Sequence, residues 1–142
     1  MKLVIASDHA GRNLKKSVLA HIRGKGLDIT DMGVDDSVER ADYPDYAVPL
    51  AEAVSEGKYD LGILVCGTGT GMAMAANRVK GARAANCFNE FLAGMARAHN
   101  NANILALGER VIGEGLALAI VDVFLNTSFE GGRHQSRLDK FA

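Results

Sequence analysis

The chain has 142 residues, the length of one domain, and a domain of this size buries roughly two-thirds of its unfolded surface without cross-links. Its 16 lysine and arginine residues nearly balance 17 aspartate and glutamate residues. The net charge of -1 therefore argues against a general nucleic-acid binder and against a protein held on anionic membranes.

The chain shows no sign of a targeting or membrane segment. Its start, "MKLVIASDHAG", reaches a charged residue after an apolar run too short for a signal peptide, and no later run approaches the roughly 20 residues of a membrane span. The two cysteines, Cys66 and Cys87, do not make a disulfide framework. We therefore expect a cytoplasmic protein with free thiols.

Short apolar runs alternate with longer amphipathic ones along the chain. In chain order, we expect a strand at 2–7, a helix at 11–26, a weaker strand at 28–33, a helix at 43–57, a strand at 60–66, a helix from about 70 to 79, a strand at 82–87, a helix at 90–100, a strand at 102–108, a helix at 113–126 and a basic tail over about 127–142. Pro49 falls inside the second helix and predicts a later start or a kink. Five strands with intervening helices predict one domain over 1–142, a three-layer α/β/α Rossmann-like sandwich with a five-stranded parallel sheet.

The last helix is unusual because its sequence "LALAIVDVFL" is apolar nearly all round. A helix on a protein surface normally keeps a polar face. Two explanations are equally compatible with the residues: the tail covers this helix, or the helix forms a contact between subunits.

The stretch "CGTGTG", residues 66–71, joins the central strand to the helix that starts near residue 70. Its glycines allow a tight turn and let several backbone N–H groups point toward one place, where the start of a helix also favours an anion. The stretch lacks the Gly-Lys-Ser/Thr ending of a P-loop and the third glycine of a dinucleotide fingerprint. By itself it fits either an anion-binding loop or a plain turn.

Cys66 stands at the first position of this loop. A cysteine at the end of a buried strand is more often a small hydrophobic residue. Here, however, it is predicted to lie at the ligand-binding edge of the sheet, beside a helix N-terminus that favours the thiolate form. A thiolate there would act as a nucleophile or as a base, whereas Cys87 has no such loop and is expected in the core.

Ligands of open parallel sheets bind outside the carboxyl ends of the strands. Besides the loop 66–71, we expect that edge to hold the residues that follow the other strands, the end of the fourth helix and the tail: Ser7, Asp8, His9, Ala10, Gly11, Asn86, Cys87, His99, Asn100, Glu109, Arg110, Arg133, His134 and Arg137. His99 ends a helix whose dipole favours the protonated form of a general acid, although "AHNN" also suits a plain helix stop. Arg133 and Arg137 are four residues apart, so a helical turn would make them a fork for phosphate; a solvated basic tail is the plainer interpretation. The histidines are scattered, and we expect no metal site.

Six stretches together resemble the type B ribose-5-phosphate isomerase family. They are "SDHAG" (7–11), "DYPDYA" (42–47), "CGTGTGM" (66–72), "AANRVKGARAA" (75–85), "RAHNNANILALGERVIG" (97–113) and "GGRH" (131–134) with Arg137. The similarity runs over essentially the whole chain in the same order. Members of this family have a Rossmann-like α/β/α domain and interconvert aldose and ketose phosphates through an enediolate, without a metal or other cofactor. The resemblance therefore implies an isomerase of ribose 5-phosphate and ribulose 5-phosphate.

The resemblance also implies roles for particular residues. Cys66 would be the base that moves a proton between C2 and C1; some members instead carry a glutamate at the position of Met72, so the chain is similar to the cysteine branch. His99 would move a proton to open the furanose ring, together with Asp8 or Thr68. The implied substrate contacts are Thr68, Gly67, Gly69, Thr70 and Gly71 around the developing oxyanion, Asn100 near the enediolate, Tyr43 closing against the sugar, and His9, Arg110, Arg133 and Arg137 at the phosphate.

In this family the site lies between two subunits, so His99 and Asn100 are expected from the partner of the chain that supplies Cys66. The resemblance thus implies a homodimer, with a tetramer left open, and it favours the interface interpretation of the last helix. The tail, about 127–142, is expected to contribute to the site or to the dimer contact.

Other functions remain open on the sequence. The loop at 34–46 is longer than expected before Tyr43, so a hexose 6-phosphate (allose or galactose) or a free sugar is an alternative substrate. The galactose enzymes of this family need two different subunits, whereas this chain carries Cys66, Thr68, His99 and both tail arginines itself. Outside enzymes, a phosphate-binding module would use the loop and the arginines but has no use for the thiol. A thiol redox protein is disfavoured because the chain has no Cys-x-x-Cys.

Overall fold

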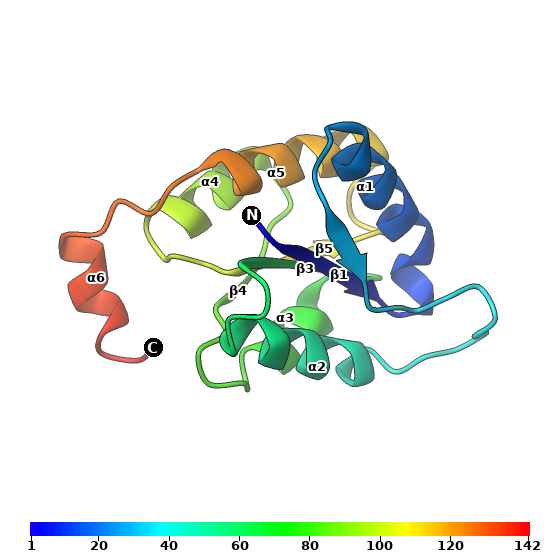
Figure 1. Ribbon diagram of the computed structural model, residues 1–142, viewed down its shortest axis with the longest axis horizontal. Helices are drawn as coiled ribbons and strands as arrows, with labels where there is room; N and C mark the ends of the chain where they lie inside the picture. Colours follow the sequence, from blue (N-terminus) through cyan, green and yellow to red (C-terminus); the bar gives the residue numbers. More distant parts are fainter.

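The centre of the structure is a sheet of five strands that all run parallel (Figure 1). The computed structural model describes residues 1–142, and the strands are β1 (Leu3–Ser7), β2 (Ile29–Asp31), β3 (Leu61–Cys66), β4 (Ala84–Asn86) and β5 (Ile104–Gly108). They lie in the order β2-β1-β3-β5-β4. All six residues of β3, the middle strand, are buried, as its apolar sequence predicts. The predicted three-layer sandwich with a five-stranded parallel sheet is confirmed.

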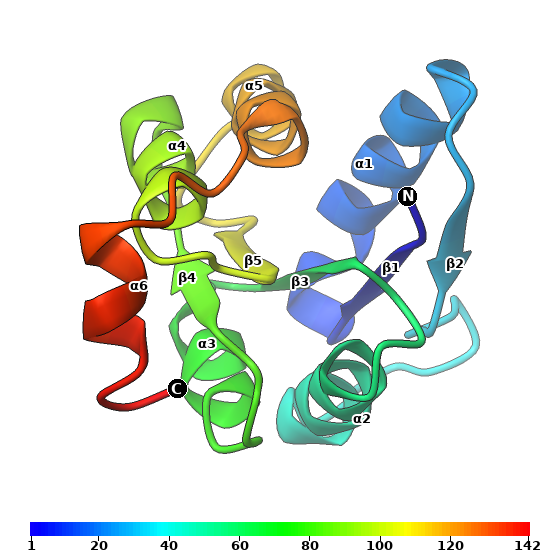
Figure 2. The same ribbon diagram turned by 60° about the vertical axis from the view of Figure 1, so that its left-hand side comes forward.

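The strand order decides where the helices lie. They are α1 (Arg12–Gly24), α2 (Pro44–Ser55), α3 (Thr70–Ala76), α4 (Glu90–Ala98), α5 (Glu114–Asn126) and α6 (Arg133–Leu138), with the one-turn 3-10 helix η1 (His9–Gly11) before α1. Crossovers between parallel strands are right-handed, so their direction along the sheet selects the face. The crossovers from β1 to β2 and from β4 to β5 run the same way and place α1 and α4 on one face, with α5. The opposite crossovers place α2 and α3 on the other face (Figure 2).

Each face of the sheet has its own hydrophobic core, because successive strand residues point to opposite sides. Leu3 and Ile5 of β1 join the core beneath α1, α4 and α5, where Phe124 is fully buried. Val4 and Ala6 of the same strand join the core beneath α2 and α3. Cys66 belongs to this second core, which it closes at the carboxyl edge of the sheet.

The predicted elements are all present, but several end earlier than expected. Helix α1 begins one residue late, after η1, and the helices predicted to reach residues 79 and 100 stop at Ala76 and Ala98. Pro49 neither delays nor ends α2, which starts at Pro44 and runs through Pro49 to Ser55. Pro49 cannot donate to the Asp45 carbonyl four residues before it; both residues are exposed, so water can satisfy that carbonyl.

The apolar helix α5 lies between α1 and α4 in the same layer. It packs against both helices and against β5, so three sides of the helix meet protein within one chain. The tail does not cover it, because α6 lies beyond α4 (Figure 1). Packing within the chain therefore accounts for most of the apolar character, and the explanation by tail cover is wrong.

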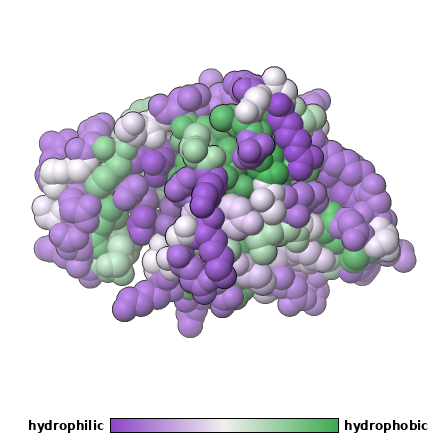
Figure 3. All heavy atoms as spheres, viewed as in Figure 1, coloured by the Kyte–Doolittle hydropathy of each residue, from purple (hydrophilic) through white to green (hydrophobic).

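The surface is mostly hydrophilic in the view of Figure 3, with hydrophobic residues gathered around α5 and the start of β1 and a second strip beside α6. None of the helices combines the length and the hydrophobicity that a bilayer-crossing segment requires.

Candidate active site

At the carboxyl ends of β1, β3 and β5 the chain leaves neighbouring strands toward opposite faces, which is the place where open parallel sheets bind ligands. From β1 it enters η1 and α1 on one face, and from β3 it enters α3 on the other. Asp8, Gly67 and Glu109 directly follow these three strands. The backbone N–H of Asp8 donates to the Val65 carbonyl at 3.2 Å, which ties the first two of these strand ends together.

The loop 66–71 turns tightly around the Cys66 sulfur. The Cys66 side chain is buried, and its Sγ accepts a hydrogen bond from the backbone N–H of Gly69 at 3.1 Å. Gly69 has a φ of 82°, a left-handed conformation that glycine adopts without strain. The sulfur therefore lies buried at the start of the loop, held by one of the loop's own N–H groups.

Close packing fixes the shape of this loop from outside. A Cβ on Gly108, at the end of β5, would lie 2.6 Å from the carbonyl group of Thr68, so only glycine fits there. The Asn86 amide reaches over from β4 and donates to the Thr68 carbonyl and to Thr70 Oγ1, both at 3.3 Å. Asn86 is thus a support for the loop, a role that its place after a strand did not predict.

Three backbone N–H groups of the loop are free to bind a ligand. Those of Gly67, Thr68 and Gly71 make no hydrogen bond within the protein, whereas those of Gly69 and Thr70 are already used by Cys66 Sγ and Thr68 Oγ1. Free N–H groups that converge on one place stabilise negative charge. The arrangement combines a sulfur that accepts hydrogen bonds with donors for an anion in six consecutive residues.

Several of the predicted substrate-binding side chains surround this loop. The Tyr43 ring lies against Gly71, where an added Cβ would be 2.8 Å from Tyr43 Cζ. The Arg110 guanidinium lies along Gly67, where an added Cβ would be 3.4 Å from Arg110 Nη1. Asp8 is buried and accepts hydrogen bonds from two N–H groups of η1, at 2.9 and 3.2 Å. We call Asp8, His9, Tyr43, Arg110 and the loop 66–71 the thiol cluster.

The loop before Tyr43 is held by the side chains of η1 and α1. His9 Nδ1 lies 3.1 Å from both backbone polar atoms of Ala41, and Lys15, itself buried, forms an ion pair with Asp31 at 2.8 Å and donates to the Val34 carbonyl. His9 is therefore engaged with the loop that leads to Tyr43 as well as being placed at the strand edge. These contacts hold the loop before Tyr43 in place, which its length and sequence did not predict.

Glu109 ties β5 to α1: its Oε1 accepts the N–H of Leu14 at 2.6 Å, in the first turn of the helix. A carboxylate at this position satisfies a helix N–H that has no partner within the helix. Sequence reasoning placed Glu109 at this edge without a role, because the helix it caps lies 95 residues earlier in the chain.

His99 and Asn100 do not lie at the thiol cluster, contrary to the expectation from the sequence. They follow α4, and a helix that returns across a parallel sheet ends at the amino edge of the strands. Gly108 pairs with Cys66 at the carboxyl edge, whereas His99 precedes Ile104, and the four residue steps of β5 alone span about 13 Å. Within one chain, His99 and Asn100 are therefore remote from Cys66.

The tail joins His99 at this second location. Arg97 donates to the Thr127 carbonyl at 3.3 Å, and the backbone N–H of Glu130 donates to the Ala98 carbonyl at 3.0 Å, so the start of the tail is fastened to the end of α4. Helix α6 then brings Arg133 and Arg137 to exposed positions one turn apart. We call His99, Asn100, Glu130, Arg133, His134 and Arg137 the histidine cluster.

The centre of the histidine cluster is a pair of stacked imidazole rings. The rings of His99 and His134 have centroids 4.1 Å apart and planes inclined by 13°. Glu130 Oε1 lies 3.9 Å from His99 Nε2 and 3.6 Å from His134 Nε2. Burial lowers the pKa of His134, with a smaller contribution from the charge of His99. The spacing of the histidines in the sequence did not reveal this pair, because α4 and α6 meet only in the fold.

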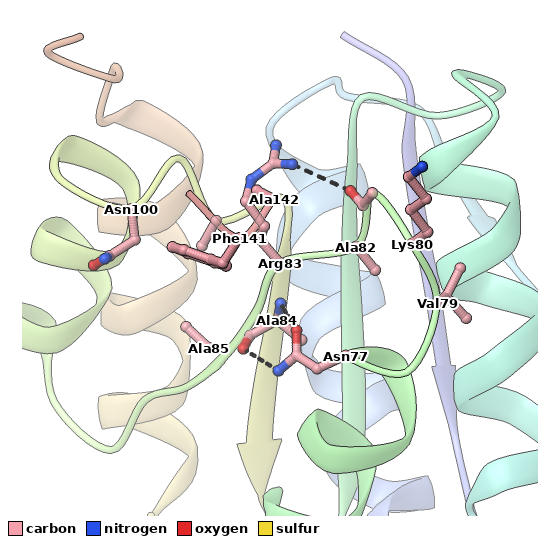
Figure 4. A pocket seen from close by; sticks show the side chains of 12 residues that line it. Asn77, Val79, Lys80, Ala82, Arg83, Ala84, Ala85, Asn100, Phe141 and Ala142 are labelled. Atoms are coloured by element: carbon pink, nitrogen blue, oxygen red, sulfur yellow. Dashed lines mark hydrogen bonds between the residues drawn. The ribbon is translucent and has the colours of Figure 1, made fainter. Parts of the chain in front are cut away.

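A pocket with a volume of about 480 Å³ lies at neither cluster's centre. It is bordered by segment 77–85 at the β4 edge and by the C-terminal residues Phe141 and Ala142, and Asn100 is the only predicted site residue in its lining (Figure 4). Arg83 and Asn77 are engaged there with the backbone of the same segment. This pocket therefore does not bring the two clusters together.

Comparison with known proteins identifies the family. The sequence model described as Ribose/Galactose Isomerase matches residues 3–141. The chain belongs to the ribose/galactose isomerase family. Its relatives in this family include ribose-5-phosphate isomerase B of Escherichia coli, which is 46% identical over 138 residues, covering 97% of this chain and 92% of that protein.

Solved structures of the ribose/galactose isomerase family resemble the chain throughout. Ribose-5-phosphate isomerase B of Clostridium thermocellum matches with a TM-score of 0.96 and 51% identity, covering 99% of this chain and 94% of that one. The enzyme of Mycoplasma genitalium, solved with bound ribulose-5-phosphate, matches with a TM-score of 0.93 and 46% identity, covering 98% and 92%. The likeness thus extends over the thiol cluster and the α6 tail alike.

Proposed function

We propose that the chain is an aldose-ketose isomerase that interconverts ribose 5-phosphate and ribulose 5-phosphate, with Cys66 as the base. The observation that carries this proposal is the loop 66–71, in which the Cys66 sulfur accepts a hydrogen bond from Gly69 and three further N–H groups have no partner within the protein. The relatives named ribose-5-phosphate isomerase B support the substrate, since they match nearly the whole chain.

The chemistry follows from the acidity of the carbon beside an aldehyde. In the open-chain aldose, the Cys66 thiolate takes the proton from C2, and the electron pair moves onto the carbonyl oxygen at C1 to give an enediolate. The free N–H groups of Gly67, Thr68 and Gly71 stabilise that charge as it develops. The thiol then returns the proton to C1 while the hydroxyl proton moves from O2 to O1, which yields the ketose and regenerates the thiolate.

A complete site needs the histidine cluster as well, and we propose that a second copy of the chain supplies it. One chain presents the thiol cluster at the carboxyl edge of the sheet and the histidine cluster across the sheet from it. In a twofold dimer, each thiol cluster meets the partner's histidine cluster, which gives two identical sites. We propose that residues 1–142 act as one domain whose tail enters the partner's site.

Exposed apolar side chains beside the loop 66–71 support this contact. Met74 on α3, Phe88 and Phe91 around the start of α4, and Val111 after β5 are 68%, 57%, 72% and 56% exposed. Large apolar side chains gathered at one edge are typical of a surface that another protein covers. In the dimer, His99 would move the proton that opens the furanose ring, Asn100 would bind near the enediolate, and Arg133 and Arg137 would bind the phosphate.

Turnover of ribose 5-phosphate tests this function directly. The protein treated with a chelator should convert ribose 5-phosphate to ribulose 5-phosphate, faster than it converts allose 6-phosphate or galactose 6-phosphate, as measured by the appearance of the ketose. A preference for either hexose phosphate would establish an isomerase of the longer sugars. A folded dimer that binds these sugar phosphates but converts none of them would contradict the proposal and support a phosphate-binding module.

Replacing Arg137 with alanine should raise KM for ribose 5-phosphate by about 10- to 100-fold, the value of one charge-assisted hydrogen bond to the phosphate, and should leave kcat within about threefold. Steady-state kinetics at constant ionic strength measures both constants. Lys140→Ala is the matched control, because it removes an exposed positive charge from the turn that follows the same helix. An unchanged KM for Arg137→Ala would remove this residue from the phosphate site.

A further inference from the structure

The stacked pair of His99 and His134 has a geometry that a plain helix stop does not need. Their rings are nearly parallel, with centroids 4.1 Å apart, and Glu130 Oε1 lies within 4 Å of an Nε2 atom of each. His134 is nearly buried, with 7% of its side chain exposed, whereas the side chain of His99 is 37% exposed. One imidazole therefore faces outward, and the other forms the surface behind it.

The pair is built to hold one positive charge. Two imidazolium rings in contact repel each other, and the single carboxylate of Glu130 compensates one charge only. Arg133 and Arg137 on α6 add further positive charge next to His134. Burial also disfavours the charged form of His134, in line with its lowered pKa. The buried ring of His134 is therefore the less favourable place for a proton, and the exposed ring of His99 is the one that a substrate can reach.

The same geometry does not suit a metal ion. An imidazole nitrogen binds a metal along the plane of its ring, and tetrahedral zinc needs those directions to converge on one point. The lone pairs of two stacked rings inclined by only 13° lie in nearly parallel planes, and the ring centroids are 4.1 Å apart, so the lone pairs do not converge well on one ion. The cluster of His99, Glu130 and His134 is thus better arranged to hold a proton than to coordinate a cation.

We propose that His134 and Glu130 are positioning residues for His99: His134 fixes the plane of the His99 ring, and the two together keep a single proton on it. This inference rests on the proposed function, in which His99 acts on the furanose ring. In that step the C1–O4 bond breaks, His99 gives its proton to the ring oxygen, and a base takes the proton of the anomeric hydroxyl, so that the open-chain aldehyde forms. His99 then regains a proton from that base or from water.

The test measures ring opening separately from isomerisation. In a Cys66→Ala background, where isomerisation stops, ring opening remains visible as exchange between the α and β anomers of ribose 5-phosphate, measured by saturation-transfer NMR. Into this background we would introduce His134→Ala, His134→Phe and Glu130→Gln, with Ser136→Ala as the control. Ser136 is an exposed residue of the same helix without a side-chain hydrogen bond.

His134→Ala should reduce the protein-dependent exchange by about tenfold through loss of orientation, and His134→Phe, which keeps a flat ring, should restore most of it. Glu130→Gln should lower, by about one pH unit, the pH above which the rate of anomer exchange falls, because a neighbouring negative charge no longer stabilises the proton of the pair. Binding of ribose 5-phosphate, followed by calorimetry, should stay within about threefold in every variant, and Ser136→Ala should change nothing.

The inference is overturned if the Glu130 and His134 variants match the Ser136→Ala control in rate and in pH dependence while the protein with Cys66 isomerises ribose 5-phosphate. Absence of that isomerisation would instead count against the proposed function. Glu130 is exposed, so Glu130→Gln reports on the proton even where His134→Ala disturbs the fold. A dimer mass and an unchanged circular dichroism spectrum verify each variant.

Discussion

Replacing Cys66 with alanine is expected to lower kcat for ribose 5-phosphate by about a thousandfold or more, because the reaction loses the group that carries the proton between C2 and C1. Binding of the substrate should change by less than about threefold, since the free N–H groups of the loop and the arginines remain. The two effects are separated by measuring turnover and, by calorimetry, the affinity for the sugar phosphate. A variant that keeps more than a tenth or so of the wild-type rate would rule out Cys66 as the base.

Two further variants distinguish the base from its surroundings. Cys66→Ser keeps an acceptor for the Gly69 N–H, so the loop should persist, but a hydroxyl is too weak an acid to be ionised at neutral pH and turnover should remain lost. Cys87→Ala is the matched control at the other thiol. Burial raises the pKa of Cys87 to about 11, so this thiol is protonated near neutral pH, and its replacement should leave kcat within about threefold.

Mixing two inactive variants is expected to restore activity. Cys66→Ala damages only the thiol cluster, and His99→Asn damages only the histidine cluster. When the two chains pair at random, about half of the dimers are mixed, and each mixed dimer has one intact site of two, so the mixture should reach about a quarter of wild-type activity per chain. The chains would be co-refolded, mixed dimers verified by mass, and ribulose 5-phosphate formation measured.

The control for this experiment pairs Cys66→Ala with Thr68→Ala. Both substitutions lie in the thiol cluster, so every thiol cluster in the mixed dimer carries one defect and activity should not return. Mixed dimers of Cys66→Ala and His99→Asn that stay as inactive as either parent would contradict a site shared between two chains. Recovery of activity in both mixtures would show that the activity does not come from pairing an intact thiol cluster with an intact histidine cluster.

Hydrophobic patterning was sufficient to predict the sheet. The run at 60–66 is apolar at every position, and only the middle of a parallel sheet buries both faces of a strand, which is where β3 lies. The glycine loop and the polar residues after the strands indicated the carboxyl edge of the sheet as the candidate site, because open parallel sheets bind ligands at that edge. The ends of the helices were harder to predict, because single-turn features such as η1 and the stop of α3 at Ala76 depend on local hydrogen bonds.

The sequence misplaced His99 and Asn100 because they were assigned to the edge where strands end. In this topology the chain reaches them at the end of α4, after it has returned across the sheet to the start of β5. The resemblance had already assigned them to the partner subunit, and the fold gives the physical reason: a single chain cannot bring them to Cys66.

Other contacts carry no signal in a single sequence. Glu109 reaches the first turn of α1, Asn86 holds the loop beside Cys66, and His134 stacks on His99, and each pair joins elements far apart in the chain. Such contacts depend on which helix ends meet in space. The i,i+4 spacing of Glu130 and His134 was readable in the sequence, but it gained meaning only when α6 was found beside the end of α4.

The distance between Cys66 and His99 has an evolutionary consequence. With the site shared between two chains as proposed, a mixed dimer needs only one intact thiol cluster and one intact histidine cluster, so a duplicated gene could lose either cluster from one copy and the opposite cluster from the other. Neither loss creates a new residue or a new contact, yet afterwards neither gene product works without its counterpart. A sheet that separates the two halves of a site thus gives this fold a route to enzymes with two unlike subunits through loss alone.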